Sequence, residues 1–373
     1  MSDYLKYYAP VAVLAVAYAG FLLGGDWIWL GIATFPGLAI LDSCFPRDFS
    51  VRRINSAFWA NIPVWISTLG PLLLYPLFAW RIAQGGMTPW QLAGGVLSCG
   101  WMSVIPLIPA AHELYHMRHW LPRTVGHYGH LCILDCTRDI GHVVGHHIDV
   151  CTPKDGDTAP RGASLYTFTP RAVVESTLYA FRKEADALRK KGLSPLDIRH
   201  RMWRAIAAQI LFQCLIFAIG GWKGVVFALC AMLLARFWVE TFNYFQHYGL
   251  IRVEGAPIGR RHVWNHLNPL SRRVAFEITN HADHHQNSYQ PFYKLEPHKP
   301  AIWMPSVFVC FLAALVPPLW QNLIAKPALR KWDFEWATPQ ERELARAQNR
   351  AAGWEDWLGE GQAVPANTAT AGI

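Results

Sequence analysis

Histidines are the residues of this sequence that most clearly predict chemistry. Nine of its sixteen histidines fall in four short segments, HELYH, HVVGHH, NYFQHYG and HADHH. Imidazole binds Fe, Zn, Cu and Ni, and residues four apart on a helix share one face, so two imidazoles can reach one ion. The nine are His112, His116, His142, His146, His147, His247, His281, His284 and His285. Because nine ligands are too many for one ion, the pattern predicts two ions with four to five ligands each.

The other seven histidines are weaker candidates. His119 lies seven residues after His112 and could face the site, and His262 and His266 could support it. The sequence leaves the contribution of these three open. The remaining four are expected at the surface or behind the ligands, and they are His127, His130, His200 and His298.

Metal-bound imidazoles need a partner for their second ring nitrogen. Asn243 lies four residues before His247 and shares its face if the helix continues. In polar loops, however, such side chains more often form turns and caps. The candidates near the four segments are Glu113, Asp139, Asp149, Asp157, Glu240, Asn243, Asn280 and Asp283.

The composition indicates that a membrane-embedded, all-α framework positions these histidines. Hydrophobic residues make up 52% of the chain and charged residues only 16%, against about 25% charged in a soluble globular protein. This balance excludes disorder, a coiled coil and a secreted disulfide scaffold. None of the eight cysteines forms a CxxC pair, so a fused rubredoxin or zinc ribbon is not expected.

Apolar stretches predict a six-transmembrane-helix bundle, since each crossing needs roughly 20 residues. Five of the stretches are charge-free, namely residues 7–25, 27–41, 54–80, 92–111 and 205–222, and the sixth, 224–240, carries charge only near its end, at Arg236 and Glu240. The predicted organisation is transmembrane helices 1–4 in residues 1–111, a cytoplasmic histidine-rich cap in 112–204, transmembrane helices 5–6 in 205–246, a cytoplasmic catalytic segment in 247–299, and an interfacial helix with a C-terminal tail in 300–373.

The end of the chain is expected to stay out of the membrane core. Residues 300–325 are charge-free, but Pro317 and Pro318 would break a spanning helix. A helix is predicted after Pro339, followed by disorder from Gln362.

The distribution of Lys and Arg predicts the orientation, because cytoplasmic loops carry the positive excess. Arg47, Arg52 and Arg53 lie in one loop, and eight more cations lie between Arg182 and Arg204. Both termini and all nine histidines are therefore expected on the cytoplasmic side of a bacterial inner membrane. The net charge of +8 fits attraction to anionic membrane lipid and docking of an acidic redox partner, and both readings stay open. A nucleic-acid partner is not expected.

The four segments resemble the histidine boxes of the membrane-bound non-haem di-iron alkane hydroxylases, within the wider desaturase–hydroxylase superfamily. The resemblance runs over most of the chain. It is closer to the xylene, toluene and p-cymene methyl monooxygenase branch, through WLGIATFP, HWLPR, FNYFQHYGL, EITNH and the tail LIAKP–LR–WD–ATP–ERELA. Alkane hydroxylases typically read NYxEHYG at the fourth box, where this chain has Gln246. That difference favours a methyl-arene substrate.

The resemblance implies a specific reaction. The nine histidines would hold two iron ions, and O2 would supply one oxygen atom to a methyl C–H bond, giving a primary alcohol. It also implies that NADH supplies electrons through a separate FAD/[2Fe–2S] reductase, with rubredoxin as the alternative partner. The chain itself shows no dinucleotide fingerprint after a predicted strand and no ferredoxin-type cysteine spacing.

Two other functions compete with this interpretation. A terminal alkane hydroxylase or an acyl-chain desaturase or hydroxylase could use the same boxes. A histidine-rich metal transporter is disfavoured, because transport sites lie near the bilayer midplane, whereas these histidines are expected at one membrane face. The aromatic residues of the first four spans would either line the substrate channel or gather at the membrane interface, and they are Trp27, Trp29, Phe58, Trp59, Trp65, Phe78, Trp80 and Trp101.

Overall fold

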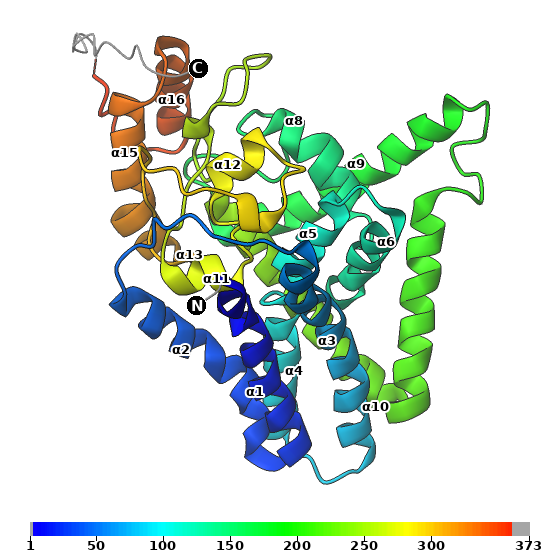
Figure 1. Ribbon diagram of the computed structural model, residues 1–373. Coiled ribbons are helices and arrows are strands. Elements are labelled where there is room, and N and C mark those ends of the chain that lie inside the picture. The colour runs from blue at the N-terminus through cyan, green and yellow to red at the C-terminus, as the bar shows by residue number, and fades with distance from the viewer. Residues whose placement is uncertain (1–2, 360–373) are drawn as a thin grey trace.

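The computed structural model describes residues 3–359, and these residues form an all-helical fold without a β-strand (Figure 1). This confirms that the protein is all-α, as predicted. Five helical segments of the described chain are long and apolar enough to cross a membrane. They are Asp3–Leu23, which contains α1 (Ala9–Leu23), Gly25–Cys44 with α2 (Leu30–Cys44), α3 (Ala57–Ala83), Pro89–His116 with α4 (Pro89–Met102) and α5 (Leu107–His116), and α10 (Arg201–Gln246).

Consecutive apolar helices pair as antiparallel hairpins whose turns lie at one end of the molecule (Figure 1). Gly24, with φ of 72°, allows the tight turn between α1 and α2. The α3–α4 turn lies beside the α1–α2 turn, and two hydrogen bonds join them. Arg81 Nε donates to the carbonyl of Phe21 at 2.6 Å, and Gln91 Nε2 donates to Asp26 at 3.2 Å. The helix ends that carry histidines therefore lie at the opposite end.

Helix α10 is bent back on itself. A straight helix of its 46 residues would be about 69 Å long, more than twice the roughly 30 Å of a bilayer core. Gly221 interrupts it with φ of 60° and ψ of −164°, a conformation that glycine adopts without a Cβ clash. Gln213 Nε2 consequently reaches Met232 Sδ at 3.3 Å, although 19 residues separate them. The bend at Gly221 falls at the end of the first of the two predicted apolar stretches, 205–222 and 224–240.

The remaining helices form a cap over the end of the bundle that carries the histidines (Figure 1). They are α6 (Trp120–Gly129), α7 (Arg138–Ile140), a π-helix (Gly141–His146), α8 (His147–Asp149), α9 (Leu165–Arg189), α11 (Pro269–Val274), α12 (His281–Gln286), α13 (Val307–Ala314), α14 (Pro317–Leu319), a second π-helix (Trp320–Ala325), α15 (Lys326–Glu335) and α16 (Pro339–Ala351).

The C-terminal region packs onto the cap and the bundle. Residues 300–325 divide into short helices, and α13 buries Val307, Phe308 and Phe311. Helix α16 begins at Pro339 as predicted. The predicted disorder from Gln362 lies outside the described residues.

Candidate metal centre

The four histidine segments converge into two adjoining groups at the cap end of the bundle. The ligand atoms of each group lie within 4.8 Å of one another. His146 and His142 connect the groups, since their rings stack with centroids 5.1 Å apart. The first group contains His112, His116, His142, His147 and His284, and the second contains His146, His247, His281 and His285.

Local helix geometry explains how one segment supplies both groups. Residues 141–146 form a π-helix, and the N–H of His147 donates to the carbonyl of His142, five residues earlier. The wider turn places His142 and His147 on one side and directs His146 to the other. In α12, His281 and His285 lie four apart and share a face, whereas His284 points to the first group.

The spacing of the ring nitrogens fits metal coordination. Two imidazole nitrogens at right angles around one ion, with bonds of ~2.1 Å, lie ~3.0 Å apart. In the first group, the Nε2 atoms of His112 and His147 lie 2.9 and 3.0 Å from Nε2 of His142. In the second, the Nε2 atoms of His247 and His285 lie 2.9 and 3.1 Å from Nε2 of His281.

Hydrogen bonding alone does not satisfy these rings. Both ring nitrogens of buried His116 lack a hydrogen-bond partner, as does Nδ1 of His285. A neutral imidazole carries only one N–H, so five ring nitrogens that lie within 4.8 Å of one another cannot all be paired by hydrogen bonds. A metal ion in each group would satisfy them, and the donor set therefore fits the predicted ions.

Burial keeps most of these imidazoles in the neutral form that binds metal. Burial and the neighbouring histidines hold the pKa values of His142 and His284 well below the usual value. Burial also lowers the pKa of His281 to about 3. His146 differs: burial acts to lower its pKa, but the adjacent Asp155 carboxylate outweighs this effect and raises it.

The second ring nitrogens find three partners that the sequence did not single out. His146 Nδ1 lies 2.9 Å from the Asp155 carboxylate. His247 Nδ1 donates to the backbone carbonyl of His262 at 3.1 Å, and His281 Nδ1 to that of Ile278 at 3.2 Å. Such contacts fix the tautomer that presents Nε2 to a metal. Two of the partners are backbone carbonyls, which side-chain patterns cannot reveal.

The side chains predicted to hold the histidines mostly hold other groups. In the described chain, no hydrogen bond joins Glu113, Asp149, Glu240, Asn243 or Asp283 to any of the nine. Glu240 instead accepts from Arg138 at 3.1 Å and from Asn243 at 3.0 Å. Asp283 accepts the backbone N–H of Glu296 at 3.0 Å, and Asp149 uses only its backbone carbonyl.

The three remaining side-chain candidates, Asp157, Asn280 and Asp139, lie in different surroundings. Asp157 lies with His146 and Asp155 in a third cluster of ligand atoms. Asn280 supports Glu277, as described below. Asp139 instead pairs with His127 and Arg201.

Of the lower-ranked histidines, His262 supports the site through its backbone carbonyl, while its Nε2 lies 2.7 Å from Glu341 of α16. His266 bonds the carbonyl of Pro305. Exposed His119 caps α6 by accepting the N–H of Leu121. The ring nitrogens of His130 are buried without a partner, outside both groups.

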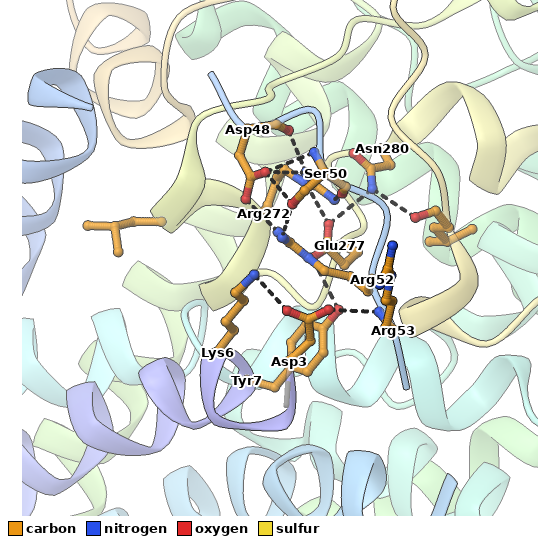
Figure 2. A network of polar contacts seen from close by, with 12 residues as sticks. Asp3, Lys6, Tyr7, Asp48, Ser50, Arg52, Arg53, Arg272, Glu277 and Asn280 are labelled. Carbon is orange, nitrogen blue, oxygen red and sulfur yellow. Dashed lines mark hydrogen bonds and ion pairs between the residues drawn. The ribbon is translucent and has the colours of Figure 1, made fainter. Parts of the chain in front are cut away.

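A buried ion network holds the turn that leads into α12 (Figure 2). Glu277 accepts hydrogen bonds from Arg52 Nε and Arg272 Nε, both at 2.6 Å, and from Tyr7 and Asn280 at 3.2 and 3.0 Å. The side chains of Glu277, Arg52 and Arg272 are all fully buried. The N-terminal segment, the loop before α3 and α11 thus meet at one carboxylate.

The backbone at this turn is strained. Phe276 and Glu277 have φ values of 46° and 56°, which is rare for residues with a Cβ and costs about 1 kcal/mol or more each. The Ile278 carbonyl that orients His281 immediately follows. The Glu277 network therefore fixes a strained turn next to the second histidine group.

A pocket adjoins both groups. Its wall includes five histidines of the two groups, and it also includes Gln246, whose buried amide has no hydrogen-bond partner. The rest of the wall is mainly aliphatic, formed by residues such as Val104, Ile105 and Val239. A mainly apolar wall with a few polar groups is typical of a site for a small organic molecule.

Of the two alternatives for the aromatic residues of the first four spans, lining of this pocket is not supported. None of the eight named side chains is in the cavity wall, where Tyr115 and Phe242 are the aromatic members. Trp27, Phe58 and Trp59 are exposed on the bundle surface, as residues at a membrane interface are. Trp101 is buried against Phe35, with ring centroids 4.3 Å apart.

The chain is similar in sequence to several known proteins. Residues 88–304 match the fatty acid desaturase family. The chain is 44% identical to the xylene/toluene monooxygenase hydroxylase component of Pseudomonas putida, over 95% of this chain and 97% of that protein. It is 31% identical to alkane 1-monooxygenase 2 of Pseudomonas aeruginosa, over 84% and 89%, and 26% identical to an alkane 1-monooxygenase of Pseudomonas putida, over 82% and 77%.

Apolar helices, paired histidine groups and an adjoining cavity define a membrane-bound, histidine-rich metalloenzyme. The chain belongs to the fatty acid desaturase family and, among its members, is an O2-dependent monooxygenase of the hydroxylase type. The predicted family and enzyme class are thereby confirmed. The two histidine groups together with this membership indicate a di-iron centre.

Proposed function

We propose that this protein hydroxylates the methyl group of an aromatic hydrocarbon, of the xylene, toluene or p-cymene type, to the primary alcohol. The observation that carries the proposal is the apolar cavity whose wall contains histidines of both groups. One oxygen atom of O2 enters the methyl C–H bond, and two electrons and two protons convert the other to water.

The nine histidines are the proposed iron ligands, five on one ion and four on the other. When bound, the two irons would supply the redox chemistry that activates O2, which zinc cannot provide. The chain's own contribution is to orient the rings through Asp155 and the carbonyls of His262 and Ile278. The aliphatic wall excludes water and holds the methyl group near the ligands, because position decides which C–H bond reacts.

The substrate preference follows from the cavity and from the relatives. A mainly apolar pocket wall with a neutral Gln246 amide suits an uncharged ring. A long alkyl chain would lose more conformational freedom on entering it. The higher identity to the xylene/toluene enzyme than to the alkane enzymes supports the same class.

We expect p-xylene to be preferred to octane when the two compete in one assay. A tenfold ratio of specificity constants corresponds to about 1.4 kcal/mol of differential transition-state binding. The measurement is the ratio of 4-methylbenzyl alcohol to 1-octanol at equal substrate concentrations. Equal or reversed selectivity would instead favour the second candidate function, a terminal alkane hydroxylase, for which the 31% identical relative is the supporting observation.

Electrons are proposed to come from NADH through a separate reductase that carries FAD and a [2Fe–2S] centre. The purified chain with NADH and O2 but without reductase should give no product, and adding the reductase should restore turnover. Product formation from NADH alone, in a preparation free of contaminating flavoprotein, would contradict the need for a partner.

The bundle is proposed to cross a bacterial inner membrane six times, with α10 contributing two crossings joined at Gly221. Three hairpins with the two ends of the described chain and the histidines on one side agree with the cytoplasmic placement of the cation-rich loops. A cysteine introduced at Gly86, in the α3–α4 turn, should react with a membrane-impermeant reagent added from the periplasmic side.

A further inference from the structure

A groove on the cap runs toward the first histidine group between α6, the π-helix 141–146 and α9. Apolar side chains in its lining include Met117, Ile140 and Val143. Six cations also line it, namely Arg118, Arg123, Lys183, Arg189, Lys190 and Arg201. Protein interfaces commonly combine apolar side chains with charged ones in this way.

The positive charge of this groove is only partly neutralised. Arg201 pairs with Asp139 and Arg189 with Asp186. In the described part of the chain, no carboxylate forms an ion pair with the other four cations. Apart from these acids, only Glu184 adds negative charge to the lining. The groove therefore presents a net positive surface to an acidic partner.

The inner end of the groove touches the histidines. Tyr115 lines the groove, and its ring centroid lies 5.2 Å from that of His116 and 5.1 Å from that of His112. Exposed Tyr289 also lines it, with its centroid 6.2 Å from that of His116. A protein bound in the groove would thus contact Tyr115 or Tyr289, whose rings lie next to histidines of the first group.

We propose that this groove is the docking surface for the reductase, which binds it through an acidic face and delivers electrons to the first histidine group. The inference rests on the proposed function. NADH is oxidised at the reductase flavin, and the [2Fe–2S] centre passes the resulting two electrons one at a time to the two irons. Anionic lipid headgroups are the competing occupant, but lipid binding does not require contact with the side chains that touch His116.

The test is the double variant Lys183→Glu/Lys190→Glu, which reverses one groove cation on α9 and one directly after its end. The matched control is Arg330→Glu on α15, an exposed cation on the far side of the cap (Figure 1). Each protein is assayed in nanodiscs with NADH and increasing reductase, at low and high salt, with and without anionic lipid.

We expect the double variant to raise the KM for reductase about tenfold at low salt with little change in kcat, because steering by surface charge acts mainly on association. The difference should shrink in high salt, where exposed charges are screened over roughly 8 Å or less. Arg330→Glu should behave as wild type. An unchanged KM in the double variant, or an equal rise in the control, would overturn the proposal. A loss that appears only with anionic lipid would assign the groove to headgroups and overturn it as well.

A single-turnover measurement separates docking from the reaction itself. Protein reduced with dithionite and then exposed to O2 and p-xylene needs no reductase. The double variant should form as much alcohol per chain as wild type. If it does not, the substitutions disturb the site and the docking proposal fails. If wild type forms none, the proposed function fails instead.

Discussion

Replacing His281 by alanine is expected to abolish product formation and to reduce bound iron from two ions per chain to about one. His281 Nε2 is central to the second group, 2.9 and 3.1 Å from two other ligand nitrogens. Losing a ligand costs more than the 10–100-fold that follows from losing a residue behind a ligand. His147→Ala should have the same effect through the first group, and iron analysis with an activity assay on purified protein measures both.

A histidine outside both groups provides the control. His298 hydrogen-bonds Arg260 near the surface, and His298→Ala should keep both irons and wild-type turnover. Full activity in His281→Ala would remove the second group from the catalytic site. Full activity in His147→Ala would do the same for the first group.

Replacing Glu277 by glutamine is expected to lower both stability and iron content, although Glu277 is not a ligand. The change removes the charge that pairs with both Arg52 and Arg272, and it leaves Asp48 as their remaining carboxylate partner. Because Asp48 keeps part of the compensation, the cost should be below the about 3–5 kcal/mol of breaking an isolated buried pair. It also releases the strained turn at Phe276 and Glu277, so the Ile278 carbonyl no longer fixes the His281 ring. The measurements are the thermal unfolding midpoint and iron per chain.

Asp135→Asn separates this positioning effect from a general loss of stability. Asp135 is also a buried carboxylate between two arginines, Arg138 and Arg236, but it lies away from α12. It should lower the unfolding midpoint comparably and keep both irons. If Glu277→Gln also keeps both irons, the network stabilises the fold without positioning the histidines.

The sequence by itself determined which segments form helices and which histidines come together to bind metal. Charge-free stretches of about 20 residues have few structures available to them in a bilayer, because every backbone polar group must be paired internally. Histidines four apart, as in HELYH, share a face wherever a helix forms. The all-helical fold, the bend in α10 near Gly221 and the convergence of the four segments could therefore be predicted before any tertiary contact was known.

Only the tertiary structure decided which histidine belongs to which group. His146 and His147 are adjacent in sequence yet lie in different groups, because a π-helix changes the angular spacing of residues 141–146. Glu277 acquires its role through contact with a distant segment, since 225 residues separate it from Arg52. Asp155 acquires its role because the loop after α8 folds back and places it beside His146, nine residues earlier. The cavity wall is aliphatic for the same reason: the packing of α4, α5 and α10 places Val104 and Val239 there, and leaves Trp27 and Phe58 on the outer surface.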